Sequence, residues 1–309
     1  CSGYKFNTRI LQIIKKKTIK MSNVLYNEVG GAGTTPKNIG GSKQAFEAPT
    51  KKIALGLESF SFATAAAFKV GTNWDAGIVA KSLAFLPVLE DAPEVANIEP
   101  AYKEGRYSKR KLKDGEESIN YKVQCSIKTY EALKSYEDSA FTRVFQISED
   151  GEVSVDVQAD GTIKGRTVSS LTVGLRFAPT DDDTGYCMVN VVFENDLFSL
   201  LKTDFDVVEK ESIYPVQFVQ TSATATEIKG KIIDLGTNLS IKSLQSGDIL
   251  VKDLSGATHT STFTAADSEG VYTLTGTGFQ SNMTVETNGV VTQAEVNYES
   301  ESATKIVVS

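Results

Sequence analysis

The densest group of chemically active side chains in this sequence is basic. It lies in the stretch "KEGRYSKRKLKDGEE", residues 103–117. Clustered lysines and arginines bind either phosphate groups or the carboxylates of another protein surface. Three interpretations are therefore open: a solvated loop, a contact with a partner subunit, or a nucleic-acid patch. The basic residues of the stretch are Lys103, Arg106, Lys109, Arg110, Lys111 and Lys113.

The charge of the rest of the chain argues against nucleic acid. The 309 residues carry a formal net charge of −7, and because residues 1–20 contribute +6, the remainder carries −13. A body this acidic repels both phosphate groups and anionic membrane surfaces. We therefore prefer a subunit contact to a nucleic-acid patch for the basic residues, and a solvated loop stays open.

Side chains suited to catalysis are sparse. The single histidine, His259, lies in the Ser/Thr-rich stretch "SGATHTSTF" and is expected to be a solvated surface residue. One histidine excludes sites built from several imidazoles. Cys1, Cys125 and Cys187 have no paired metal or disulfide spacing, and the last two lie in strand-like stretches, which favours buried free thiols.

Two short motifs resemble binding loops but lack the residues that such loops need. "GGAGTTPKNIGG" (30–41) has no Gly-Lys-Ser/Thr ending, so we interpret it as an extended arm rather than a phosphate loop. "TDDDTG" (180–185) does not alternate its acids as a calcium loop does, so it is expected to be a solvated hairpin loop. We expect no catalytic, cofactor-binding or metal-binding residue, and a protein that is not an enzyme.

The elements that position these residues are expected to be mainly strands. "NYKVQCSIK" (120–128), "EVSVDV" (152–157), "SLTVGLRF" (170–177) and "YCMVNVVF" (186–193) alternate or run apolar, as half-buried strands do. Asp-Gly and Asn-Gly pairs punctuate the chain at 114–115, 150–151, 160–161 and 288–289 and supply the positive φ of tight turns. The pattern predicts antiparallel strands joined by short turns.

One helix is expected to pack on these strands. In "TYEALKSYEDSAF" (129–141), Tyr130, Leu133, Tyr136 and Ala140 recur at helical spacing, and Thr129 is a suitable N-cap. A weaker second helix is predicted in "DLFSLLKTDF" (196–205). The fold class is therefore mainly β: an antiparallel β-sandwich or barrel-type domain with one packed helix over residues 51–213. A smaller Ig-like β-sandwich is predicted over 214–309, where short strands and Ser/Thr-rich turns alternate.

Residues 51–205 resemble the major tail tube proteins of long-tailed bacteriophages. The likeness rests on the order of features: a Gly-rich arm, a β-region, the charged loop "NIEPAYKEGRYSKRKLKDGEES", the helix "YEALKSYEDSAF" and the paired strands "RTVSSLTVGLRFAPTDDDTGYCMVNVVF". The C-terminal part resembles the Ig-like domains that decorate phage tail and capsid proteins.

The resemblance implies a structural role in the virion tail, assembled in the bacterial host cytoplasm. Subunits of this family form rings, usually hexameric, that stack through long loops and terminal arms and pass DNA through the lumen. The implied partners are further copies of the chain and other virion tail proteins, with DNA only as passing cargo and no cofactor or membrane. The basic residues 103–113 and the arm 21–50 would form the contacts between rings.

The first line of the chain supports a rival hypothesis. "CSGYKFNTRILQIIKKKTIKM" begins with a cysteine that could be acylated in a bacterial surface lipoprotein or adhesin-like binding module. The stretch is nevertheless basic and Ile-rich, unlike the polar tether that usually follows such a cysteine. We therefore expect the native start at Met21, with residues 1–20 as a non-native leader. A β-sandwich enzyme acting on carbohydrate is a third hypothesis, disfavoured by the single Trp74.

Overall fold

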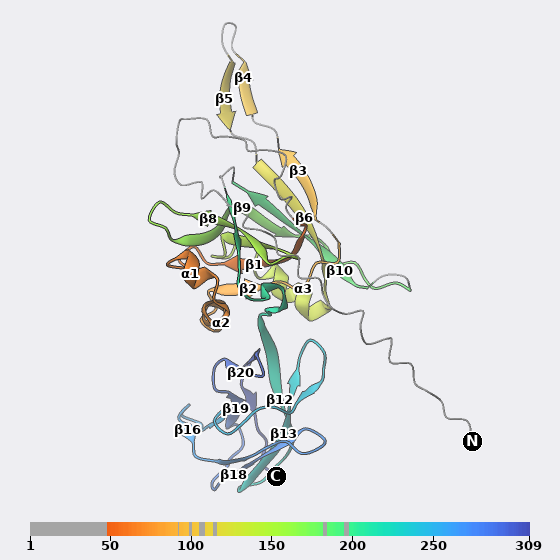
Figure 1. Ribbon diagram of the computed structural model, residues 1–309. Coiled ribbons are helices and arrows are strands. Elements are labelled where there is room, and N and C mark those ends of the chain that lie inside the picture. The colour runs from red at the N-terminus through yellow and green to blue at the C-terminus, as the bar shows by residue number, and fades with distance from the viewer. Residues whose placement is uncertain are drawn as a thin grey trace, which may run out of the picture.

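The computed structural model describes residues 48–91, 93–98, 101–104, 109–113, 116–181, 184–194 and 198–309. The expected leader 1–20 and most of the arm 21–50 lie outside these ranges. The described chain is mainly β and is built from antiparallel sheets, which confirms the predicted fold class. Below, the N-terminal body denotes residues 48–210, and the C-terminal sandwich denotes residues 213–309 (Figure 1).

The N-terminal body contains a nine-stranded sheet, a separate two-stranded hairpin, three α-helices and one 3-10 turn among its described residues. The sheet follows the order β2-β1-β7-β8-β9-β10-β6-β3, and β11 pairs with β8. The elements are β1 (Thr50–Gly56), α1 (Ala65–Phe68), α2 (Gly71–Val79), β2 (Leu83–Phe85), β3 (Glu94–Ile98), β4 (Ala101–Glu104), β5 (Lys109–Lys113), β6 (Glu116–Gln124), α3 (Ile127–Lys134), β7 (Arg143–Ser148), β8 (Glu152–Val157), β9 (Ile163–Val173), β10 (Tyr186–Phe193), β11 (Ser199–Lys202) and η1 (Val207–Glu209).

Strand β9 bends the sheet into two layers. Its first half, 163–167, pairs with β7 and β8, whereas its second half, 168–173, pairs with β10. The layers enclose one hydrophobic core that includes Tyr121 and Val191, both fully buried. On the outer face of the β1–β7–β8 layer, α1 and α2 cover a second core around the fully buried Trp74. The Nε1 of Trp74 donates a hydrogen bond to the carbonyl of Phe68 at 2.7 Å.

The C-terminal sandwich has a seven-stranded and a four-stranded sheet around one core. Its first strand, β12, pairs antiparallel with β13 and parallel with β21, so the first and the last part of the domain are joined directly. Its strands are β12 (Ile213–Ala223), β13 (Glu227–Asp234), β14 (Ser240–Ile241), β15 (Ile249–Lys252), β16 (Thr258–His259), β17 (Thr262–Thr264), β18 (Val271–Thr275), β19 (Thr284–Thr287), β20 (Val291–Gln293), β21 (Val296–Ser300) and β22 (Thr304–Lys305).

Several expected elements differ in detail. Helix α3 begins at Ile127 and is capped by Ser126, whose Oγ accepts a hydrogen bond from the backbone N–H of Thr129, so the expected cap is three residues too late. The helix predicted over 196–205 is wrong, because Ser199–Lys202 forms β11 and pairs with β8. Helices α1 and α2 were not predicted.

The turns were predicted more accurately. Gly151, Gly161 and Gly289 have φ angles of +75°, +84° and +63°. The first two join the antiparallel pairs β7–β8 and β8–β9, as expected. Gly289 instead joins β19 and β20, which belong to different sheets. The fourth pair, 114–115, lies outside the described residues, and the strands on its two sides pair with β4 and with β3.

Candidate functional site: assembly surfaces and the cleft

A long two-stranded ribbon projects from the N-terminal body. In the register, β3 pairs with β6 up to Ile98 opposite Glu116, and β4 pairs with β5 from Ala101 opposite Lys113. The second pairing continues the first in the same direction along the chain. The hairpin β4–β5 therefore extends the ribbon beyond the sheet, on the side opposite the C-terminal sandwich (Figure 1).

Five of the six basic residues singled out in the sequence fall on this hairpin. Lys103 lies on β4, and the other four lie on β5, whereas Arg106 is outside the described residues. In the register, Lys103 is opposite Arg110, and Glu104 is opposite Lys109. The residues on β5 are Lys109, Arg110, Lys111 and Lys113.

The two ends of the nine-stranded sheet differ in exposure. At one end, β2 pairs with β1 and its three residues are buried. At the other end, β3 pairs with β6 alone among the described strands, and Val95 on β3 is 58% exposed. An open edge presents unpaired backbone N–H and C=O groups to any strand that can reach them. Among the described residues, β3 is thus an edge strand with an exposed side chain at Val95.

A buried lysine forms hydrogen bonds to the connector, residues 207–212, which leads to the C-terminal sandwich. Lys52 on β1 is 2% exposed, and its Nζ donates hydrogen bonds to the carbonyls of Val208, at 2.9 Å, and of Lys210. The Nζ of Lys210 in turn contacts both carboxylate oxygens of Asp75 on α2, at 2.6 and 2.7 Å. Because β12 begins at Ile213, only two residues separate this fastened turn from the C-terminal sandwich.

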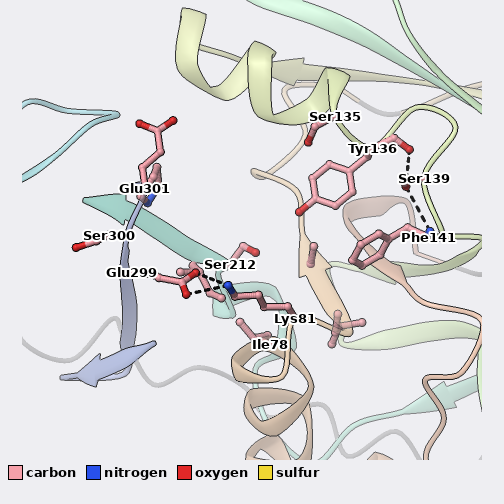
Figure 2. A pocket seen from close by; sticks show the side chains of 14 residues that line it. Ile78, Lys81, Ser135, Tyr136, Ser139, Phe141, Ser212, Glu299, Ser300 and Glu301 are labelled. Carbon is pink, nitrogen blue, oxygen red and sulfur yellow. Dashed lines mark hydrogen bonds and ion pairs between the residues drawn. The ribbon is translucent and has the colours of Figure 1, made fainter. Parts of the chain in front are cut away.

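A cleft of about 390 Å³ separates the N-terminal body from the C-terminal sandwich. Figure 2 shows Tyr136 and Phe141 on one side and Glu299, Ser300 and Glu301 on the other. The ion pair that crosses it joins Lys81, after α2, to Glu299 on β21, with Nζ 2.7 Å from Oε2. The apolar part of the lining consists of Ile78, Leu83, Ala84, Tyr136, Phe141, Ile213 and Pro215.

The rim of the cleft is acidic. Its charged lining residues are Lys81, Glu299 and Glu301, and the first two form the ion pair already described. Glu301 has 54% of its side chain exposed, and its contact with the Nζ of Lys128 is long, at 3.9 Å. Of the charged residues that line the cleft, Glu301 therefore has the longest ion pair within the chain.

A second cavity, of about 300 Å³, opens between the two layers of the N-terminal body. One of its lining residues is Arg166, which is 5% exposed. The guanidinium donates to Gln146 at 2.7 Å and to Glu117 at 2.5 Å, and it lies over the rings of Phe193 and Phe198, 4.0 and 4.3 Å from their centroids. Because these partners all belong to the chain itself, we assign the cluster a structural role.

The remaining candidate residues gave mixed outcomes. Cys125 and Cys187 are buried free thiols, as predicted, and burial raises the pKa of Cys187. His259 is half-buried on β16 with its ring 5.0 Å from that of Phe279, so it is less exposed than expected. Asp181 is exposed, and the two acids after it lie outside the described residues.

Within the described ranges, no group of three or more His, Cys, Asp or Glu side chains could hold a metal ion. None of the helices described there combines the length and the apolar character that crossing a bilayer requires.

No family model matches the chain, and no curated protein matches it.

The cleft was missed at the level of sequence. Its lining comes from four separate segments, around residues 78–84, 135–141, 212–215 and 299–301. The segments contribute ordinary apolar, serine, lysine and glutamate side chains, and no local motif distinguishes them. The one available signal was the pair of acids in "YESESA" near the C-terminus, Glu299 and Glu301, whose carboxylates lie at the rim.

Proposed function

We propose that this chain is a non-enzymatic structural subunit of the tail tube of a long-tailed bacteriophage. In this proposal, subunits join into rings, the rings stack, and DNA passes through the lumen. The protein would belong to the virion tail and assemble in the cytoplasm of the bacterial host. Its partners would be further copies of itself and other tail proteins.

The observation that carries the proposal is the projecting ribbon with its open edge. A two-stranded ribbon is marginally stable by itself, because it lacks a third strand or a packed face. Here β3 has an exposed edge, and the hairpin β4–β5 continues past the sheet. Pairing of β3 with a neighbouring copy would supply the missing strand, and repetition of that contact around an axis would close a ring.

The charge distribution is compatible with passing DNA. Apart from residues 1–20, the chain carries a net charge of −13, so most of its surface repels phosphate groups. Residues 101–113 carry a net charge of +5, and the proposal places them in contacts between subunits. A lumen formed by the remaining surface would not retain DNA.

The proposal is tested by expressing the chain from Met21 without tags at either terminus. Negative-stain electron microscopy is expected to show rings or tubes, and sedimentation velocity is expected to show species far larger than 33.4 kDa. A chain that stays monomeric at high concentration would contradict the proposal.

An edge variant shows whether β3 makes the ring contact. In Val95→Lys, a charge on the exposed edge opposes strand pairing with another copy, as lysines do on natural edge strands. Val88→Lys is the matched control, because Val88 is 42% exposed and lies outside the strands. We expect Val95→Lys to abolish rings and Val88→Lys to leave them intact. Equal behaviour of the two variants would exclude β3 as the ring edge.

A further inference from the structure

We propose that the cleft between the N-terminal body and the C-terminal sandwich receives basic side chains from the hairpin β4–β5 of a second copy. The inference rests on the proposed function and names the surface that its basic residues contact. It concerns the interaction between successive rings, whereas the edge of β3 concerns the interaction within one ring.

The positions of the two surfaces favour a head-to-tail contact. The hairpin and the C-terminal sandwich lie at opposite ends of the N-terminal body (Figure 1). The cleft is lined in part by residues 213–215 and 299–301 of the sandwich, so it lies at that end. A contact between two different surfaces of the same chain is not closed when two copies form a dimer. It leaves a free hairpin at one end and a free cleft at the other, so it propagates.

The lining of the cleft suits lysine and arginine side chains. Such side chains lay their aliphatic stems along apolar surface and keep the charged group at a polar edge. In the cleft, Phe141, Ile213 and Pro215 supply partly exposed apolar surface, and the carboxylate of Glu301 lies at the rim. The hydroxyl group of Tyr136 adds an acceptor, and burial raises the pKa of this group, so it stays protonated at neutral pH.

The charges of the two surfaces are complementary. Residues 101–113 contain six basic residues and one acid, Glu104, for a net charge of +5. The charged residues lining the cleft sum to −1, because Lys81 balances Glu299 and Glu301 remains. A hairpin cation would replace the long contact between Glu301 and Lys128 with a shorter one.

The first experiment reverses the charge at the rim of the cleft. In the chain that begins at Met21, Glu301→Lys is expected to weaken the self-association measured by sedimentation about tenfold, because it places a cation against the incoming hairpin. Glu269→Lys is the matched control, since Glu269 is exposed on the same sandwich and does not line the cleft. A combined Glu301→Lys and Lys111→Glu chain should recover most of the lost association.

The second experiment locates the contact. The chain from Met21 lacks Cys1, and its other thiols, at positions 125 and 187, are buried. A variant with both Ser212→Cys and Lys111→Cys, treated with a short bismaleimide, is expected to give a ladder of covalent dimers, trimers and larger species. Either cysteine alone should stop at dimers or below. Moving the first cysteine to Glu269→Cys, away from the cleft, should abolish the ladder.

The outcomes separate this inference from the function on which it rests. If tubes form and Glu301→Lys associates as tightly as Glu269→Lys, the cleft is not the hairpin's partner, and the tail tube proposal stands. If the unaltered chain does not associate at all, both proposals are wrong. Loss of association in Glu301→Lys with recovery in the combined chain, together with the ladder, supports the cleft contact.

Discussion

The Nζ of Lys52 lies 2.9 Å from the carbonyl oxygen of Val208, which is 156 residues later in the chain. This hydrogen bond ties the first strand of the N-terminal body to the turn that precedes the C-terminal sandwich. Burial lowers the pKa of Lys52, and the nearby carboxylates of Glu211, Glu209 and Asp206 oppose that shift. The hydrogen bonds from the Nζ of Lys52 to the carbonyls of Val208 and Lys210 hold the connector in place.

Replacement of Lys52 by methionine is expected to destabilise the N-terminal body by about 2 kcal/mol. The change keeps the length of the side chain but leaves two carbonyls of the connector without their donor, and an unsatisfied buried acceptor costs about 1–3 kcal/mol. Lys51→Met is the matched control, because Lys51 has 42% of its side chain exposed and makes only a 3.8 Å ion pair with Glu149. Urea unfolding followed by the fluorescence of Trp74 measures the difference. Equal stability of the two variants would exclude an anchoring role for Lys52.

Because of the ion pair between Arg143 and Glu58, the free energy of unfolding depends on pH in the acidic range. The guanidinium of Arg143 donates to both carboxylate oxygens of Glu58, at 2.7 and 2.8 Å, and Lys164 adds a third donor. These contacts lower the pKa of Glu58 to about 2 from its usual 4.5. Because the pKa is lower in the folded chain, the pair stabilises the fold fully above pH 4.5 and progressively less as the pH falls toward 2.

We therefore expect Glu58→Gln to lower the free energy of unfolding at pH 7 by no more than about 1 kcal/mol, since the half-exposed carboxylate is screened by water. The difference from the unaltered chain should shrink as the pH is lowered from 4.5 toward 2. Urea titrations at several pH values test this. Glu149→Gln, which removes a longer and more exposed ion pair, should show little difference at any of them. A deficit in Glu58→Gln that does not change with pH would contradict the assignment.

The sequence predicted the strands well where one face is buried along the whole run. In β10, Cys187, Val189, Val191 and Phe193 are all buried, as the alternation requires. The same reasoning failed where apolar and polar residues continue to alternate beyond the last residue that the core buries. Leu175 and Phe177 continue the pattern of β9 past its end at Val173, and they are 80% and 51% exposed. Alternation indicates a pleated strand, but the end of the core depends on residues far away in sequence.

The helices were harder to predict because their stability comes from tertiary contacts. Helix α2 begins after Val70, which makes no side-chain capping bond, and it has no acidic residue in its first turn. What holds it is the packing of Trp74 against aromatic rings from other elements, such as Phe62 at 4.9 Å and Phe145 at 5.3 Å. Conversely, the apolar residues of β11 have no period that separates a short strand from a helix, and the pairing of Leu200 with Ser154 decides the matter.

The N-cap of α3 gives a direct test of where sequence and structure disagree. Ser126→Ala removes the Oγ that accepts from the N–H of Thr129 at 3.1 Å, so it is expected to cost about 1 kcal/mol of stability. Thr129→Ala keeps that backbone donor and the serine acceptor, and should cost distinctly less. Urea unfolding of both variants distinguishes them. A larger loss in Thr129→Ala would place the start of the helix where the sequence alone suggested.

Gly165 lies where three strands meet, and the space around it allows no side chain. A Cβ atom there would be 2.9 Å from the backbone N and C of Val144, which cannot move without disturbing β7. We expect Gly165→Ala to destabilise the N-terminal body by about 1–3 kcal/mol, as overpacking does. Gly236→Ala is the control, since its nearest contact would be 3.4 Å from a carboxylate oxygen of Asp234. Similar unfolding midpoints for the two variants would show that β7 and β9 can separate freely.

The C-terminal sandwich is expected to fold without the rest of the chain. All hydrogen-bonded strand pairs of residues 213–309 lie within that range, and so does the core around Phe218, Ile232 and Tyr272. Its ion pairs with the N-terminal body, at Glu299 and Glu301, involve side chains at the rim of the cleft, and exposed pairs contribute little to stability. A chain of residues 213–309 should therefore give dispersed amide resonances and a cooperative thermal transition.

A chain that begins at Thr224 provides the control for this prediction. It lacks β12, which pairs with β13 on one side and with β21 on the other, so its sheet loses a central strand and the buried side chains of Val216 and Phe218. We expect the shorter chain to remain unfolded, with narrow amide dispersion. If residues 213–309 also fail to fold, the sandwich depends on the N-terminal body.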